Sequence, residues 1–119
     1  MNRTTLFAIV VTMLLAAPVA SACDYPRRAS IADGATATKD EMIVSQKSVK
    51  EYMAAMDEYL TCIETEEADI VASLDSPETN DLQQRESILA KKYNAAIAEM
   101  EIIAAEFNVQ VRAYKERAK

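Results

Sequence analysis

The alternation of apolar and polar residues predicts two long helices joined by a short turn. In the first arm an apolar residue returns every seven positions, at Met42, Val49, Met56, Ile63 and Ile70. The second arm carries two such lines: Leu82, Leu89, Ala96 and Ile103, and beside them Tyr93, Met100, Phe107 and Tyr114. A seven-residue repeat is typical of a helix that packs along a partner helix. We therefore expect an all-α protein.

The ends of both helices carry recognisable signals. Thr38, three residues before Glu41, has the pattern of a capping box. The repeat stops at Asp75, after which Ser76 can cap a second helix and Pro77 can occupy its first position. We predict helices over residues 39–74 and 77–116 and a turn at 75–76, within one domain that covers residues 38–119.

A reversal at Ser76 would place residues level with each other when their numbers add to about 152. Under this condition Met56 lies level with Ala96, and Val49 lies level with Ile103. The two repeats therefore predict a long antiparallel two-helix hairpin that resembles a coiled coil. Four apolar residues lie off the seam, namely Ile43, Ile88, Ile102 and Val109. The segment before the first helix covers them, or a second chain does, or they are scattered exposed residues.

The start of the chain has the features of an export signal. A basic residue, Arg3, precedes twelve residues without charge, and Ala20, Ser21 and Ala22 give the small residues that a signal peptidase needs. As a helix the apolar part spans about 18 Å, short of the roughly 30 Å of a membrane core. We expect residues 1–22 to be removed during export to the periplasm of a Gram-negative bacterium.

The two cysteines, Cys23 and Cys62, are expected to form a disulfide in an oxidising compartment. Cys62 lies about 36 Å along the first helix, and the residues from Cys23 to Thr38 reach about 50 Å when extended. The bond therefore requires residues 23–37 to run back along the hairpin, with Tyr25, Pro26 and Ile31 as packing residues and Gly34 at the reversal. The alternative is a lipid on Cys23, because residues 20–23 resemble a lipobox, except that Ala20 replaces the usual branched residue.

Charge and residue types exclude several classes of function. Loss of Arg3 with the leader moves the formal net charge from −6 to −7, so nucleic acid is a poor partner. The chain has no histidine and no glycine-rich phosphate loop, and we expect neither an enzyme nor a cofactor. The thioethers of Met53, Met56 and Met100 could hold Cu(I), although methionines at this spacing usually fill a helix seam.

Four stretches resemble small exported helical proteins of proteobacteria that carry no assigned function. They are DGATATKDEM (33–42), VKEYMAAMDEYLTCIE (49–64), KKYNAAIAEME (91–101) and FNVQVRAYKER (107–117). This resemblance implies a secreted or periplasmic protein and names no activity. We expect a non-enzymatic protein of the cell envelope that binds another protein or a second copy of itself. A membrane location is expected only if Cys23 is lipidated.

Overall fold

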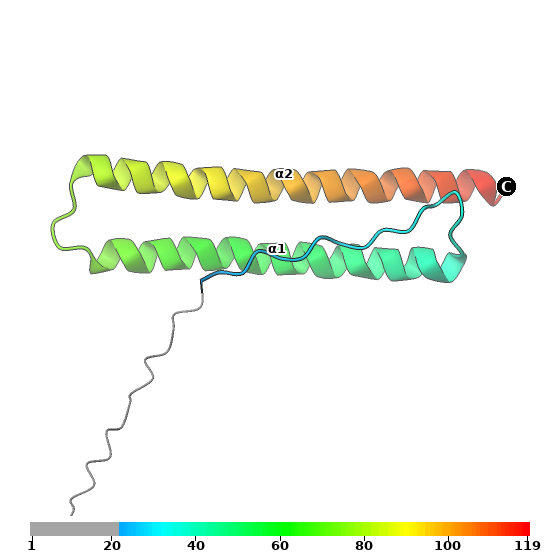
Figure 1. Ribbon diagram of the computed structural model, residues 1–119, viewed down its shortest axis with the longest axis horizontal. Coiled ribbons are helices and arrows are strands. Elements are labelled where there is room, and N and C mark those ends of the chain that lie inside the picture. The colour runs from blue at the N-terminus through cyan, green and yellow to red at the C-terminus, as the bar shows by residue number, and fades with distance from the viewer. Residues whose placement is uncertain (1–21) are drawn as a thin grey trace, which may run out of the picture.

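The computed structural model describes residues 22–119, which form an antiparallel helical hairpin with an extended segment along it (Figure 1). Helix α1 spans Lys39–Ser73 and helix α2 spans Thr79–Arg117, and the two pack against each other. The all-α hairpin expected from the two repeats is thus confirmed. Apart from Ala22, the expected leader lies outside the described residues. No helix within the described range is both long and apolar enough to cross a membrane.

Helix α1 begins with the capping box that the sequence contains. The amide of Glu41 donates to Thr38 Oγ1 (3.2 Å), and the amide of Thr38 donates to the Glu41 carboxylate (2.6 Å). The bond from the Thr38 backbone, followed by that from its side chain, lowers the pKa of Glu41, because the ionised carboxylate is the better acceptor. At the same end of the hairpin, Arg117 donates to the carbonyl of Ala37 and so ties the end of α2 to the start of α1.

The turn differs from its prediction. Helix α1 ends at Ser73, and α2 begins at Thr79 with Glu78 as its N-cap, which makes no side-chain capping bond. Ser76 has a φ of 52°, in the left-handed region, whereas an N-cap residue has extended backbone. Ser76 is therefore part of the reversal and does not cap α2, and Pro77 lies in the loop before the helix.

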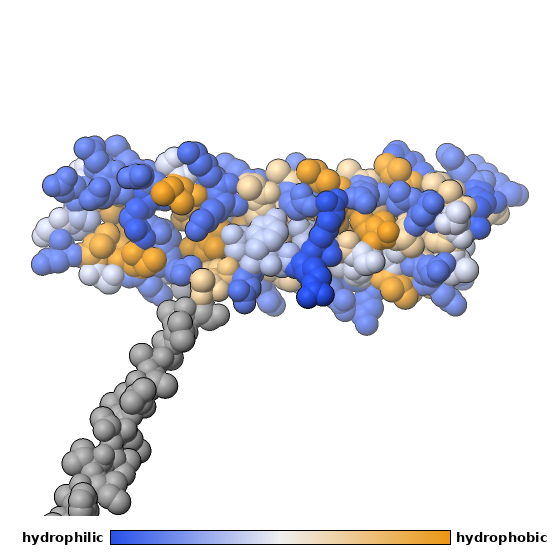
Figure 2. Space-filling model, in the orientation of Figure 1, coloured by the Kyte–Doolittle hydropathy of each residue, from blue (hydrophilic) through white to orange (hydrophobic). Residues whose placement is uncertain are grey.

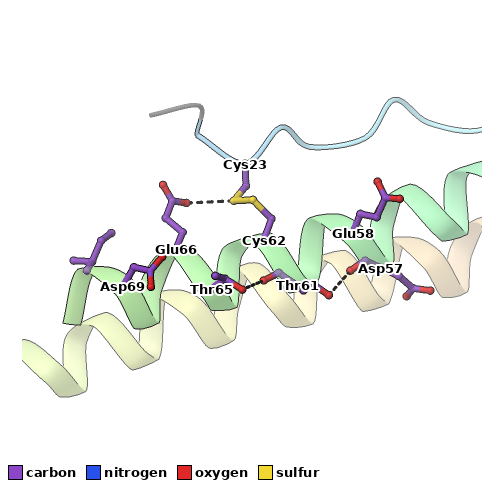
Figure 3. Close-up of a pocket in the computed structure, with 9 residues that line it drawn as sticks. Cys23, Asp57, Glu58, Thr61, Cys62, Thr65, Glu66 and Asp69 are labelled. Atoms are coloured by element: carbon purple, nitrogen blue, oxygen red, sulfur yellow. Dashed lines mark hydrogen bonds between the residues drawn. A yellow bond between two sulfur atoms is a disulfide. The ribbon is translucent and has the colours of Figure 1, made fainter. Parts of the chain in front are cut away.

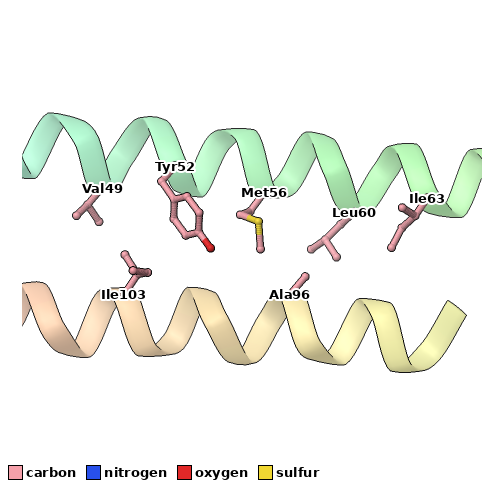
Figure 4. Close-up of a cluster of buried hydrophobic side chains, with 7 residues drawn as sticks. All are labelled: Val49, Tyr52, Met56, Leu60, Ile63, Ala96 and Ile103. Atoms are coloured by element: carbon pink, nitrogen blue, oxygen red, sulfur yellow. The ribbon is translucent and has the colours of Figure 1, made fainter. Parts of the chain in front are cut away.

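The core is a single row of side chains between the middle parts of the helices (Figure 4). Ile103 lies opposite Val49 and Tyr52, and Ala96 lies opposite Met56 and Leu60, so the register follows the expected reversal. Met56, Ala96 and Ile103 are fully buried. The buried row consists of Val49, Tyr52, Met56, Leu60, Ile63, Ala96 and Ile103.

The remaining seam residues show how far this core extends. Met42 is buried, and four residues are half-buried against the core: Leu89, Tyr93, Met100 and Phe107. Toward the turn Leu82 is half-buried, but Ile70 is 37% exposed, so the seam predicted at that position does not close. A bidentate ion pair joins the helices there, with Arg85 Nε 2.7 Å from a Glu67 carboxylate oxygen.

Two neighbouring isoleucines of α2 test this description of the core. Ile103 is completely buried and Ile102 is 52% exposed. Replacing Ile103 by alanine should lower the free energy of unfolding by about 2–5 kcal/mol, because it leaves a cavity opposite Val49. The matched change Ile102→Ala should cost less than about 1 kcal/mol. Urea unfolding followed by circular dichroism measures both, and equal losses would contradict the seam.

Candidate functional site

The candidate site, called the groove below, is the surface of the hairpin along which the N-terminal segment, residues 22–37, lies (Figure 1). Cys23 forms a disulfide with Cys62 of α1, with their Cα atoms 5.9 Å apart. The predicted pairing of the two cysteines is therefore present. Because the sulfur of Cys23 is bonded to Cys62, it cannot also carry a thioether to a lipid, and the lipid-anchor alternative conflicts with this bond.

Two serines of α1 hold the backbone of the segment. The amide of Ala32 donates to Ser45 Oγ (2.8 Å), and the amide of Ser30 donates to Ser48 Oγ (2.9 Å). Ser45 is buried, and its own hydroxyl donates to the carbonyl of Glu41 (3.0 Å). These serines were missed by the sequence reasoning. Both serines lie on the same face of α1 as Tyr52, Tyr59 and Cys62, because these five residues follow one another at steps of three, four or seven. This spacing is the signal that could have placed the serines beside the segment.

Arg28 connects the segment to α2. Its guanidinium lies 3.3 Å from a carboxylate oxygen of Glu99 and 2.6 Å from one of Glu106. The two glutamates are seven residues apart and therefore lie on one face of the helix. One cation against two carboxylates leaves a net charge of about −1 at this position. The partly exposed geometry means that the pairs position the segment more than they stabilise the fold.

The segment turns into α1 at Gly34, against the last part of α2. The amide of Gly34 donates to Oε1 of Gln110 (2.8 Å), and the amide of Ala37 donates to the carbonyl of Asp33 (2.7 Å). Gly34 has a negative φ, so it is not needed for a left-handed turn. A Cβ at this position would overlap with the backbone carbonyl of Gln110, so a side chain has no room here.

Three tyrosines lie together near the start of the segment, Tyr25 within it and Tyr52 and Tyr59 on α1. The rings of Tyr25 and Tyr59 meet edge to face with centroids 5.1 Å apart, although Tyr25 remains half exposed. Tyr52 is buried, and its hydroxyl is the one buried side-chain polar atom within residues 22–119 that lacks a hydrogen-bond partner. Burial raises the pKa of Tyr52 to about 12, and the neighbouring Tyr25 and Glu99 act in the same direction.

Beside the disulfide is an open hollow of the surface with acidic sides (Figure 3). A carboxylate oxygen of Glu66 lies 3.4 Å from Cys23 Sγ, which carries no hydrogen in the disulfide and so makes only a contact. Thr61 and Thr65 donate to backbone carbonyls of their own helix. In the described part of the chain no group of three or more Cys, Asp or Glu side chains is arranged to hold a metal ion.

The methionines considered as copper ligands belong to the packing of the hairpin. Met56 is completely buried in the core, and Met53 and Met100 are half-buried against it. This is the role of packing side chains, which the seven-residue spacing already favours.

Comparison with known proteins gives no match to this chain. No protein-family model matches the chain. No curated protein and no solved structure matches it either.

Removal of the disulfide should release the segment. In the variant C23S/C62S the free energy of unfolding should fall by about 4 kcal/mol, because a loop of some 40 residues is no longer closed in the unfolded chain. Trypsin cleavage after Arg27 and Arg28 should accelerate more than cleavage after Lys50 in α1. Mass spectrometry of a digestion series measures both rates, and an unchanged ratio would contradict a segment held mainly by the disulfide.

Tyr52 should titrate apart from the other tyrosines. Its neutral form is favoured in the folded protein, so its contribution to stability is present below pH 10 and is lost as the pH rises toward 12. Tyrosinate absorbance should show one late component that Tyr52→Phe removes. Because the hydroxyl has no partner, this variant should unfold at the same urea concentration as the wild type or higher, and a clear loss of stability would show a bond to the hydroxyl.

Proposed function

We propose that this is a non-enzymatic protein of the cell envelope that acts by binding another protein along its helical hairpin. The observation that carries the proposal is the set of four apolar side chains that lie off the seam. Ile43, Ile88, Ile102 and Val109 are each about half exposed, between 48% and 53%. Of the three possibilities for these residues, coverage by the N-terminal segment does not occur. Three of them, Ile88, Ile102 and Val109, are spaced by multiples of seven on one side of α2, and apolar residues gathered in this way favour an interaction site.

We also propose export to the periplasm of a Gram-negative bacterium. The basic residue, the apolar run and the small residues before Cys23 support it, since together they have the pattern of a cleaved signal. The disulfide between Cys23 and Cys62 supports it weakly, because such bonds persist in oxidising compartments. The resemblance to small exported proteins of proteobacteria points the same way.

The protein made with its own leader should yield a periplasmic product that begins at Cys23. Its intact mass should lie about two hydrogens below that of the chain 23–119 and return to it after reduction. A gain of several hundred daltons would instead mean acyl chains on Cys23 and would make the lipid-anchored alternative the correct one.

Binding is tested with a photo-crosslinking amino acid placed on the hairpin in the periplasm. At Ile102 it should give a defined crosslink to a protein, identified by mass spectrometry. At Lys50, an exposed polar position of α1, it should give none. If neither position crosslinks to any protein, including other copies of the chain, the proposed function is wrong.

A further inference from the structure

The outer side of α2 carries a second apolar line, separate from the buried seam; its first residue, Ile88, also borders a hollow that Ile63 and Ile70 of α1 line. Ile88, Ala95, Ile102 and Val109 repeat every seven residues, and Ala98 and Ala105 fall between them at steps of three and four. All six of these residues are exposed. Figure 2 shows apolar patches along α2 on the face that carries the N-terminal segment. The line is about 32 Å long at helical rise, and its spacing is that of a coiled-coil seam.

The charges beside this line have an order that is complementary to itself. Arg85, Lys92, Glu99 and Glu106 also repeat every seven residues, with two basic positions followed by two acidic ones. Against a second α2 in the opposite direction, Arg85 would lie beside Glu106 of the second copy and Lys92 beside Glu99. The twofold axis repeats both pairs. In a parallel pair the same position of the two copies lies on opposite flanks of the seam, so these charges can meet only in an antiparallel pair.

Three of the four flank residues already form ion pairs within the hairpin, Arg85 with Glu67 of α1 and the two glutamates with Arg28, so a second copy would add to these pairs. Glu99 and Glu106 share one guanidinium, that of Arg28, and therefore keep about one negative charge between them. Lys92 is exposed, and none of the ion pairs among residues 22–119 involves it. In the antiparallel pair, Lys92 of one copy would supply the second cation that these carboxylates lack.

The same register gives suitable packing along the line. It places Ala95 against Ala98 of the second copy near the twofold axis, where two small side chains allow the helices to approach closely. It also places Ile88 against Ala105, so that a large residue meets a small one. Lys91, the one charged residue within the line, would extend its aliphatic stem over Ile102 of the second copy.

We infer that α2 pairs in antiparallel fashion with α2 of a second copy through this outer line. The inference rests on the proposed function, in that the hairpin surface binds protein, and it names a second copy of this chain as the partner. The pair is an interaction between two complete hairpins, each with its disulfide formed, and the groove of the N-terminal segment stays within each copy.

Sedimentation equilibrium of the oxidised chain 23–119 over a range of concentrations tests the inference. The wild type should show a monomer–dimer equilibrium that weakens at high salt. Ile102→Asp should raise the dissociation constant about tenfold or more, because a carboxylate replaces the apolar side chain on which the stem of Lys91 of the second copy would pack. The matched variant Ile43→Asp, equally exposed but on α1, should dimerise as the wild type does. Circular dichroism checks that both variants keep their helices.

A charge exchange tests the direction of pairing. The variant R85E/K92E carries four acidic positions along the flank, and E99K/E106K carries four basic ones. Each alone should be more monomeric than the wild type, whereas their equimolar mixture should form a one-to-one heterodimer. Recovery only in the mixture is specific to complementary flanks and is not expected from a loss of folding.

Three outcomes would overturn the inference: a wild type that stays monomeric at all concentrations, equal effects of the two aspartate variants, or no association in the charge-exchanged mixture. A monomeric wild type whose position 102 still crosslinks to a different protein would remove the second copy as partner and leave the proposed function standing. Absence of any crosslink at positions 102 and 50 would remove both.

Discussion

The disulfide between Cys23 and Cys62 decides whether this hairpin has a third layer. The N-terminal segment is extended and makes no helix, and ordering its backbone costs about 1–2 kcal/mol per residue. Two hydrogen bonds to Ser45 and Ser48 and the exposed pairs of Arg28 return only a part of that cost. The disulfide restricts the conformations open to a detached segment, so detachment gains less entropy. The many weak contacts then suffice to hold the segment in one register.

The extent of the core follows from the extent of the segment. The buried residues of α1 lie between Met42 and Ile63, and the segment covers the same stretch, from the start of α1 to Cys62. Beyond Ile63 only two helices remain, and Ile70 and Leu74 are partly exposed although the seven-residue repeat reaches Ile70. A helix pair alone leaves its seam open at both sides, so the ion pair of Glu67 with Arg85 is the main contact described near the turn.

Much of this architecture could be predicted because its determinants are periodic or are limits of length. The two repeats predict helices and their register, and the reach of residues 23–38 permits the disulfide. The contacts of an extended segment have no period, so Arg28 and the two serines could not be assigned partners in advance. At the turn, the pattern Ser76-Pro77 fits an N-cap as well as a loop, and only the backbone geometry, with the left-handed Ser76, decides between them.

The groove and the outer face of α2 are electrostatically connected through two residues. Glu99 and Glu106 lie at the border between the two surfaces, and Arg28 approaches them from the groove side. Because the charge of Arg28 is fixed, the docked segment determines how much negative charge these carboxylates present on the outer face. An α2 without the segment would show both carboxylates uncompensated, while Lys92 would be unaffected. The balance of charges along α2 is therefore a property of the disulfide-bonded protein, and it cannot be read from the helix alone.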